Sequence, residues 1–246
     1  MSHALIDISN VDFTWPSARA FRLEVAKLEV EVGSRVFLVG PSGSGKSTLL
    51  SLICGIVRPQ AGKISILGTD IVQLSDVQRD RFRAEHIGVV FQQFNLLPYG
   101  SLVDNVLLPL SFAPERLTRV RANGHQASDD ARRLLSALGL GDLPAGMPAS
   151  DLSIGQQQRV AVARALIGSP ELVIADEPTS ALDRVAQDRF LDLIFEQLAA
   201  TQATLLMVSH DERLAERFDR VIDLQDLITV RRVDETGEAG ERTVAA

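Results

Sequence analysis

The stretch GPSGSGKST, residues 40–48, constrains this chain more than any other part of it. It directly follows the apolar run VFLV and directly precedes the helical pattern STLLSLICGI, which predicts a strand, a glycine-rich loop and a helix in that order. Glycines let the backbone wrap so closely that N–H groups from about Gly43 to Thr48 point at phosphate oxygens, and the helix N-terminus favours negative charge. The alternative is a Gly/Ser-rich turn with an incidental lysine, which the complete match in this context disfavours. The stretch therefore predicts a nucleoside triphosphate site.

Two side chains in this loop have distinct expected roles. Lys46 should reach the β- and γ-phosphates, and Ser47 should ligate Mg²⁺. The residues expected to bind the nucleotide are Gly40, Pro41, Ser42, Gly43, Ser44, Gly45, Lys46, Ser47 and Thr48.

The run ELVIADEP, residues 171–178, predicts a buried strand that ends in two carboxylates. A strand buried on both faces should not end in charge unless a cation or a reaction uses that charge. Asp176 is expected to hold Mg²⁺ through water, and Glu177 to orient or deprotonate the attacking water. The alternative is a polar strand end that caps the following turn.

His210 follows another apolar strand, in LLMVSHD. A lone histidine there is often a structural residue whose hydrogen bonds are satisfied. Ends of parallel strands converge at the edge where such sheets bind ligands, so His210 could instead sense the γ-phosphate and hold Glu177 or the water in place.

The chain alternates short apolar runs with helical patterns, which predicts an α/β fold. Runs typical of central parallel strands are residues 36–39, 63–67, 87–91, 172–175, 204–209 and 221–224, and helices are expected at 47–56, 156–167 and 187–199. Between about Asn95 and Gln158 the strand signal disappears and a Leu/Ala-rich helical pattern replaces it, which predicts an inserted helical subdomain. We expect a discontinuous core of residues 1–92 and 160–228, a helical subdomain of residues 93–159 and a polar tail from residue 229, floppy or loosely docked.

Composition excludes several classes of protein. The net charge of −7 argues against a broad nucleic-acid footprint. The arginines of residues 79–83 and 116–121 are interleaved with Asp80, Glu85 and Glu115, which predicts a solvated face or, second, a partner contact. The single Cys54 lies in an apolar run and is expected in the core. The N-terminal residues have no leader pattern and no apolar run approaches the roughly 18 residues of a membrane helix, so a cytosolic chain is expected.

The stretch DLSIGQQQR, residues 151–159, predicts the start of a helix. Ser153 followed by Gln156 is a capping-box pattern, which makes Ser153 the N-cap and places Ile154 at the first helical position and Gly155 at the second. The first helical position requires only φ near −60°, which isoleucine adopts.

Five motifs follow one another along the chain: the phosphate loop, FQQ, LSIGQQQR, IADEPTSALD and SH. With these motifs in this order, the chain resembles the ATP-binding cassette (ABC) ATPases from Val11 to Leu224. The resemblance implies a P-loop NTPase core with a parallel-rich central sheet, an N-terminal antiparallel β portion and an inserted helical subdomain. It also implies ATP and Mg²⁺ as ligands, a head-to-tail dimer of two copies around two ATP, integral membrane permease partners and a place at the cytoplasmic face of the membrane, with no nucleic acid.

The resemblance extends to single residues. It implies that Gln92 links Mg²⁺ and the water to the helical subdomain, that residues 180–183 communicate across the dimer, and that His210 is the switch histidine. It implies that Trp15 stacks on adenine, although an ordinary core aromatic is the alternative because Phe13 and Trp15 alternate. Residues implied to contact ATP from the partner side are Ser153, Gly155, Gln156 and Asp183.

Ile154 stands where the family commonly has glycine. The groups expected to meet the partner's γ-phosphate are the Ser153 hydroxyl and the N–H groups near Gly155, where a side chain would obstruct close approach. A working site is therefore expected, and a site impaired by Ile154 is the alternative.

Residues 94–110, FNLLPYGSLVDNVLLPL, more closely resemble the subgroup that works with lipoprotein-release and macrolide-exporter permeases. The resemblance implies that a groove near Phe94 receives a helix of the permease, with ordinary core packing of Leu96 and Leu97 as the alternative. Two other functions stay open at this point: a soluble ABC-type ATPase of DNA repair or translation, and a non-hydrolytic ATP-binding regulatory module.

Overall fold

The computed structural model describes residues 4–15, 21–122, 124, 126–180 and 182–232. The chain divides into two compact units, which we call the first unit (Met1–Val32, Val36–Arg79 and His210–Ala246) and the second unit (Gly33–Arg35 and Asp80–Ser209). Helix α2 (Asp76–His86) spans the division between them.

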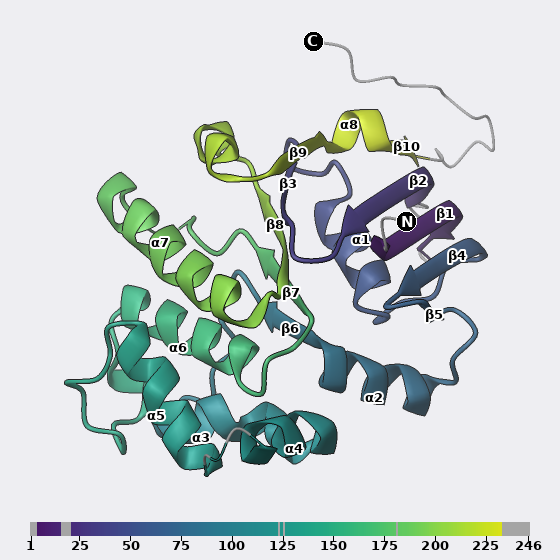
Figure 1. Ribbon diagram of the computed structural model, residues 1–246. Helices are drawn as coiled ribbons and strands as arrows, with labels where there is room; N and C mark the ends of the chain where they lie inside the picture. Colours follow the sequence, from purple (N-terminus) through teal and green to yellow (C-terminus); the bar gives the residue numbers. More distant parts are fainter. Residues whose placement is uncertain (1–3, 16–20, 123, 125, 181, 233–246) are drawn as a thin grey trace. The chain divides into compact units, whose positions relative to one another are not determined.

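The first unit contains an antiparallel sheet and a parallel strand pair (Figure 1). In the sheet the order is β10-β2-β1-β4-β5, with Ile8 opposite Leu28 and Phe13 opposite Leu23 in the β1–β2 register. Strand β3 pairs in parallel with β9. The elements are β1 (Ala4–Thr14), β2 (Phe21–Glu31), β3 (Arg35–Val39), α1 (Lys46–Ile53), β4 (Ala61–Ile66), β5 (Thr69–Asp70), η3 (Glu212–Arg217), β9 (Arg220–Asp223), α8 (Leu224–Leu227) and β10 (Ile228–Arg232).

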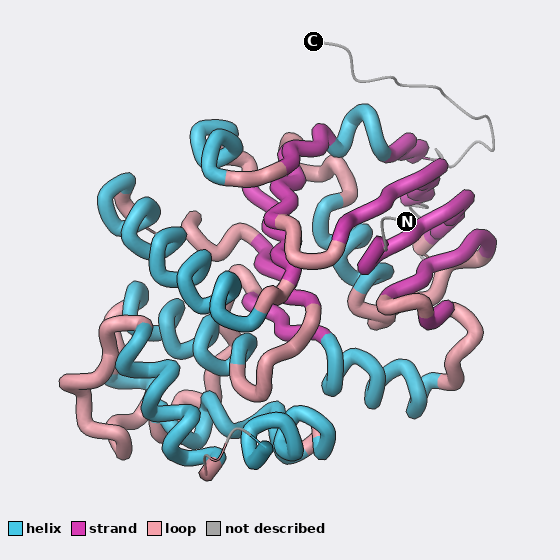
Figure 2. The backbone as a smooth tube through the Cα atoms, in the orientation of Figure 1, coloured by secondary structure: helices cyan, strands magenta, loops and turns pink. Residues whose placement is uncertain are grey.

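The second unit combines three parallel strands with most of the helices (Figure 2). Strand β7 lies between β6 and β8 and pairs in parallel with both. Every residue of β8 is buried, as is typical of an interior strand. The elements are β6 (Ile87–Val90), α3 (Leu102–Leu107), η1 (Leu108–Ser111), α4 (Pro114–Ala122), α5 (Ala127–Ala137), η2 (Ala149–Asp151), α6 (Ile154–Leu166), β7 (Leu172–Asp176), α7 (Arg184–Thr201) and β8 (Thr204–Ser209).

The predicted fold class is confirmed, because parallel strands, an N-terminal antiparallel sheet and a helix-rich stretch are all present. One strand was assigned to the wrong kind of sheet. The run at residues 63–67 was expected among the parallel strands, but it forms β4, which pairs antiparallel with β1. A short apolar run has the same appearance in both kinds of sheet, so its composition alone could not separate them.

Strand β10 lies at the start of the predicted tail. Residues 228–232 pair with β2, Thr229 opposite Glu24 and Arg231 opposite Arg22, so the tail does not begin at residue 229 as expected. Four residues beyond Ile228 are too few to show a period, which explains why the sequence did not reveal this strand. Residues 233–246 lie outside the described residues. The boundaries of the predicted helical subdomain, 93–159, stay a prediction.

The expected solvated face of arginines is wrong at two positions. Arg79 is buried and its Nε donates to the carbonyl of Gly55 at 2.7 Å. Arg116 is almost completely buried, and its guanidinium donates to the carbonyls of Ala165 and Ile167 at the end of α6. Burial lowers the pKa of Arg116 to about 10. These arginines cap backbone carbonyls, a role that the sequence did not indicate.

Cys54 is buried, as expected. Among the helices of the described ranges, none is both long enough and apolar enough to cross a membrane.

Candidate ATP site

The phosphate loop follows β3 and ends at the first turn of α1, both in the first unit. Gly43 and Gly45 have φ of 81° and 95°, in the left-handed region that favours glycine. The N–H of Ser44 donates to the carbonyl of Pro41 at 3.2 Å, which closes the turn. The predicted strand, loop and helix are therefore present, with α1 beginning at Lys46.

The N-terminus of α1 has no side-chain cap among the described residues. Gly45 is its N-cap, no side chain of the described residues caps it, and its first turn contains no acid. The Oγ of Ser44 is buried and has no hydrogen-bond partner among the described residues. A helix N-terminus with unsatisfied donors and a buried free hydroxyl favours an anion, since phosphate oxygens would accept from these groups. The loop fits the phosphates of a nucleotide.

Lys46 lies over this loop. Its side chain is buried, and Nζ donates to the carbonyls of Gly40 at 2.7 Å and Pro41 at 3.2 Å. These bonds hold the ammonium group against the loop, at the place where phosphate charge would collect.

Trp15 is beside the same helix. Its Nε1 donates to Oγ1 of Thr48 at 3.3 Å, and its ring meets Phe13 edge-on with centroids 5.0 Å apart. The side chain is 36% exposed, so the alternative of a core aromatic is wrong, while Phe13 is the buried member of the pair. The exposed ring next to the phosphate loop supports the predicted stacking on adenine, which stays a prediction.

The two carboxylates end β7 in the second unit. Asp176 is the last residue of the strand, and both side chains are half-buried. Glu177 has φ of 45°, a left-handed conformation that is costly for glutamate, and its N–H donates to the carbonyl of Val208 at 2.9 Å. Strained backbone of this kind is typical of functional positions.

The start of α6 agrees with the predicted register. Ser153 is the N-cap, its Oγ accepts from the N–H of Gln156 at 3.3 Å, and Oε1 of Gln156 accepts from the N–H of Ser153 at 2.8 Å. Ile154 is the first helical residue and its side chain is 58% exposed, so it projects away from the chain. The capping box is confirmed.

Gly155 has no need of glycine within its own chain. A Cβ placed there would meet Leu182 at 3.8 Å, an ordinary contact, and its φ is not left-handed. A side chain at this position would therefore fit within the chain, so the glycine leaves the backbone of the first turn accessible.

Gln92 is exposed in the turn after β6, and the backbone beyond it is held in an unusual conformation. Phe94 and Asn95 have φ of 54° and 48°. The guanidinium of Arg164, on α6, donates to both of their carbonyls, at 2.6 Å for Asn95. Leu97 is 45% exposed, so the core-packing alternative is wrong for this residue.

His210 and Asp183 each lie directly beside the end of a secondary-structure element. His210 is exposed directly after β8. Asp183 is the N-cap of α7, and its Oδ1 accepts from the N–H of Ala186 at 2.9 Å. Ala181, within the predicted communicating segment 180–183, lies outside the described residues.

The predicted residues fall into two groups, one in each unit. The first unit holds Trp15, the phosphate loop and His210, and the second holds Gln92, Ser153, Gly155, Gln156, Asp176, Glu177 and Asp183. Direct contacts within the groups join Trp15 to Thr48 and bring Gly155 within reach of Leu182.

Sequence reasoning missed the residues that hold these segments in place. The buried side chains of Asn105, Gln158, Arg164 and Gln187 all donate to carbonyls of the loops that carry Gln92 and Glu177 or follow them. A signal was available for Gln158, since it shares a helical face with the buried Ala161, Val162 and Ala165.

The predicted Mg²⁺ ligands fit a cation held partly by its substrate. Ser47, Gln92 and Asp176 offer only oxygen donors in their expected roles, which suits Mg²⁺. No group of three or more His, Cys, Asp or Glu residues within the described ranges could hold a metal on its own.

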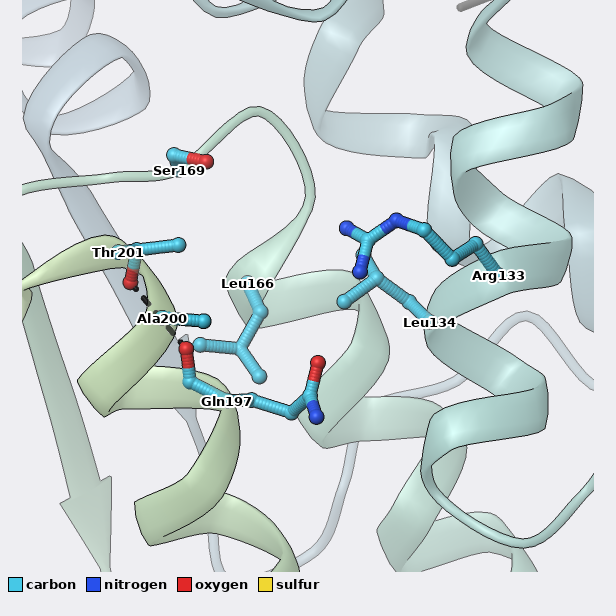
Figure 3. Close-up of a pocket in the computed structure, with 7 residues that line it drawn as sticks. All are labelled: Arg133, Leu134, Leu166, Ser169, Gln197, Ala200 and Thr201. Carbon is cyan, nitrogen blue, oxygen red and sulfur yellow. Dashed lines mark hydrogen bonds between the residues drawn. The ribbon is translucent and has the colours of Figure 1, made fainter.

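A cavity of about 320 Å³ lies elsewhere in the second unit (Figure 3). Arg133 and Leu134 of α5, Leu166 of α6 and Gln197 of α7 line it, and none of the predicted site residues does. It has no part in the nucleotide chemistry argued from the sequence.

Comparison with known proteins connects these observations to one family. The ABC transporter family matches residues 23–180. The macrolide export ATP-binding/permease protein MacB of Rhodopirellula baltica is 39% identical over 88% of this chain, which spans only 31% of that protein's length. The lipoprotein-releasing system ATP-binding protein LolD 1 of Caulobacter vibrioides is 44% identical over 79% of this chain and 80% of its own.

Solved structures lead to the same family. The dimeric structure of MJ0796, a bacterial ABC transporter cassette, has a TM-score of 0.74 at 32% identity and covers 89% of this chain and 93% of its own. A dimeric post-hydrolysis state of the same cassette, bound to ADP and Pi, matches equally well. The expected subgroup is confirmed by the MacB and LolD relatives. This chain belongs to the ABC transporter family, as one of its ATP-binding and ATP-hydrolysing subunits.

Proposed function

We propose that this chain hydrolyses ATP in a head-to-tail dimer of two copies and drives a membrane permease of the export type, for a lipoprotein, peptide or drug. The observation that carries the proposal is Glu177, a half-buried carboxylate in a left-handed backbone conformation at the end of a buried strand. A module that only bound ATP would have no use for a strained carboxylate in this position. The chain acts from the cytoplasmic face of the membrane, bound to its permease.

In this proposal each phosphate contact comes from a group already described. The N–H groups of the loop, the free hydroxyl of Ser44 and the ammonium group of Lys46 bind the phosphates, and Trp15 stacks on adenine. Ser47, Gln92 and Asp176 hold Mg²⁺. When bound, Mg²⁺ neutralises charge on the phosphate oxygens.

Hydrolysis is an in-line attack of water on the γ-phosphate. Glu177 orients the water and accepts its proton, and His210 contacts the γ-phosphate and holds the water or Glu177 in place. The bond between the γ-phosphorus and the bridging oxygen breaks, and ADP leaves with that oxygen.

The second half of each site comes from the other copy. Because Oγ of Ser153 already accepts from Gln156, its O–H is free to donate to the γ-phosphate of the partner's ATP. Gly155 allows the phosphate to approach the N–H groups of the first turn, and Gln156 and Asp183 add contacts from the same copy. ATP therefore joins the copies, and hydrolysis removes the group that both of them bind.

The central test is Glu177→Gln. We expect the variant to bind ATP, to lose hydrolysis by at least about 100-fold, and to accumulate as an ATP-bound dimer, as measured by phosphate release and light scattering. Glu171→Gln is the matched control, because Glu171 flanks the opposite end of β7 and pairs with His86 and Arg119. Its turnover should stay within about threefold of wild type. Unchanged turnover in Glu177→Gln would exclude the assigned role.

A second experiment tests the transport assignment. Purification of the chain from native membranes should bring with it an integral membrane permease, identified by mass spectrometry. Repeated purification without any membrane protein would argue for one of the soluble alternatives.

A further inference from the structure

Two buried glutamines hold the backbone directly after Glu177. Nε2 of Gln158, on α6, donates to the carbonyl of Pro178, and Nε2 of Gln187, on α7, donates to the carbonyl of Thr179 at 3.2 Å. Both glutamine side chains are buried, as is Thr179. Two consecutive peptides are thus each bound by an amide from a different helix.

The strained residue, Glu177, directly precedes the backbone that is held in this way. Glu177 has φ of 45°, and its own N–H is bonded to Val208 of β8. A left-handed glutamate persists only where the surrounding contacts leave it no alternative. The bonds to Val208, Pro178 and Thr179 are among those contacts, so they help to fix the backbone that carries the carboxylate of Glu177.

If position 158 only filled space in the core, glutamine would be less stable there than an apolar residue of the same size. Its Oε1 is buried and has no hydrogen-bond partner within the described residues, which costs free energy. Methionine has similar length and would fill the same space without a buried free acceptor. The glutamine supplies one thing that methionine lacks, the N–H that binds Pro178.

We propose that Gln158 is a positioning residue for ATP hydrolysis, which acts by holding the carbonyl of Pro178, the residue after Glu177, and so helps to fix the position of the catalytic carboxylate. Gln187 supports the next peptide in the same way. The inference rests on the proposed role of Glu177 and goes beyond it, because it assigns the positioning of that carboxylate to a residue on α6, the helix that Ser153 caps.

Gln158→Met is the variant that separates positioning from packing. We expect kcat to fall by at least about tenfold while the KM for ATP stays within about threefold, because the base is displaced and the binding groups are not. The thermal midpoint should stay within about 4 °C of wild type, since the lost hydrogen bond is offset by removal of the buried free acceptor. Gln157→Met is the matched control: its Nε2 donates to Leu152 instead, and its kcat should stay within twofold.

The same change in the Glu177→Gln background tests whether Gln158 acts through the base. ATP-induced dimerisation of Glu177→Gln should be unaffected by adding Gln158→Met, because no functional carboxylate remains to be positioned. A purely structural role would weaken dimerisation or lower the thermal midpoint in both backgrounds, and that result would overturn the proposal. So would an unchanged kcat in folded Gln158→Met.

Gln187→Met provides an independent variant should Gln158→Met not fold. It should lower kcat by at least about threefold with the KM unchanged. If Gln158→Met does not fold, an unchanged kcat in folded Gln187→Met overturns the inference. Failure of the proposed function looks different, since then Glu177→Gln itself would hydrolyse ATP at the wild-type rate.

Discussion

The N-termini of α1 and α6 differ in how their backbone donors are satisfied. At α1 the N-cap is Gly45, no side chain of the described residues caps the helix, and the Oγ of Ser44 lies buried without a partner in that part of the chain. At α6 the N-cap is Ser153, and its capping box with Gln156 satisfies donors at both positions. At α1 no side chain of the described residues satisfies a backbone donor, whereas at α6 two donors are satisfied within the chain.

This difference indicates the order in which the two helix starts bind ATP. Phosphate would accept hydrogen bonds from the unsatisfied donors at the start of α1, which favours ATP binding there by a single chain. The start of α6 is stable without a ligand and keeps only the Ser153 hydroxyl hydrogen and an accessible Gly155 backbone for one. In the proposed cycle ATP binds α1 first, and α6 of the other copy joins afterwards.

The largest effect is expected at α1, from Lys46→Met. This variant keeps the length of the side chain and removes the ammonium group, which donates to the carbonyls of Gly40 and Pro41 in the loop. Loss of charge-assisted bonds worth about 3 kcal/mol should weaken ATP binding by at least about 100-fold, measured by fluorescent-nucleotide titration. Lys63→Met, at an exposed position of β4, is the control and should bind ATP as wild type does. Wild-type affinity in Lys46→Met would mean that α1 does not bind the phosphates.

A smaller effect is expected at α6, from Gly155→Ala. The added Cβ fits the chain, with Leu182 at 3.8 Å, and alanine favours helix over glycine by up to about 1 kcal/mol. The thermal midpoint should stay level or rise, while turnover and ATP-induced dimerisation should fall by at least about tenfold, because the methyl group obstructs the partner's phosphate.

Gly45→Ala makes the same substitution at α1 and should behave differently. Gly45 has φ of 95°, so alanine there should cost about 1 kcal/mol or more of folding stability, measured by thermal unfolding. If Gly155→Ala kept full turnover, the glycine of α6 would have no role in contacting a second copy.

The sequence revealed local patterns well and contacts between distant segments poorly. The capping box of Ser153 and Gln156 was found because its two partners are three residues apart, and the phosphate loop because all of its parts are contiguous. The assignment of β4 failed because pairing direction depends on β1, whose paired residues lie 49 to 60 positions earlier in the chain, and not on the run itself. The buried bonds of Arg116 to the end of α6 were missed for the same reason.

The missed residues of the site have a common character. Arg164 and Gln158 are polar residues on the buried side of α6, and their partners are carbonyls of loops far along the chain. A helical pattern shows that such residues face inward, but not which carbonyl each one binds. Sequence therefore predicted the groups expected to touch ATP and missed those that hold them in place.

The smallest effect is expected from Ile154→Gly, which restores the residue common in the family. Ile154 occupies the first helical position with its side chain 58% exposed, so it neither blocks the helix start nor fills the core. Removing it should change turnover by less than about tenfold, equivalent to roughly 1.4 kcal/mol of barrier, as measured by phosphate release. Ile154→Ala separates side-chain bulk from backbone freedom. A rise of more than tenfold in both variants would show that the isoleucine obstructs the partner's phosphate, and a rise in glycine alone would show that α6 must loosen for hydrolysis.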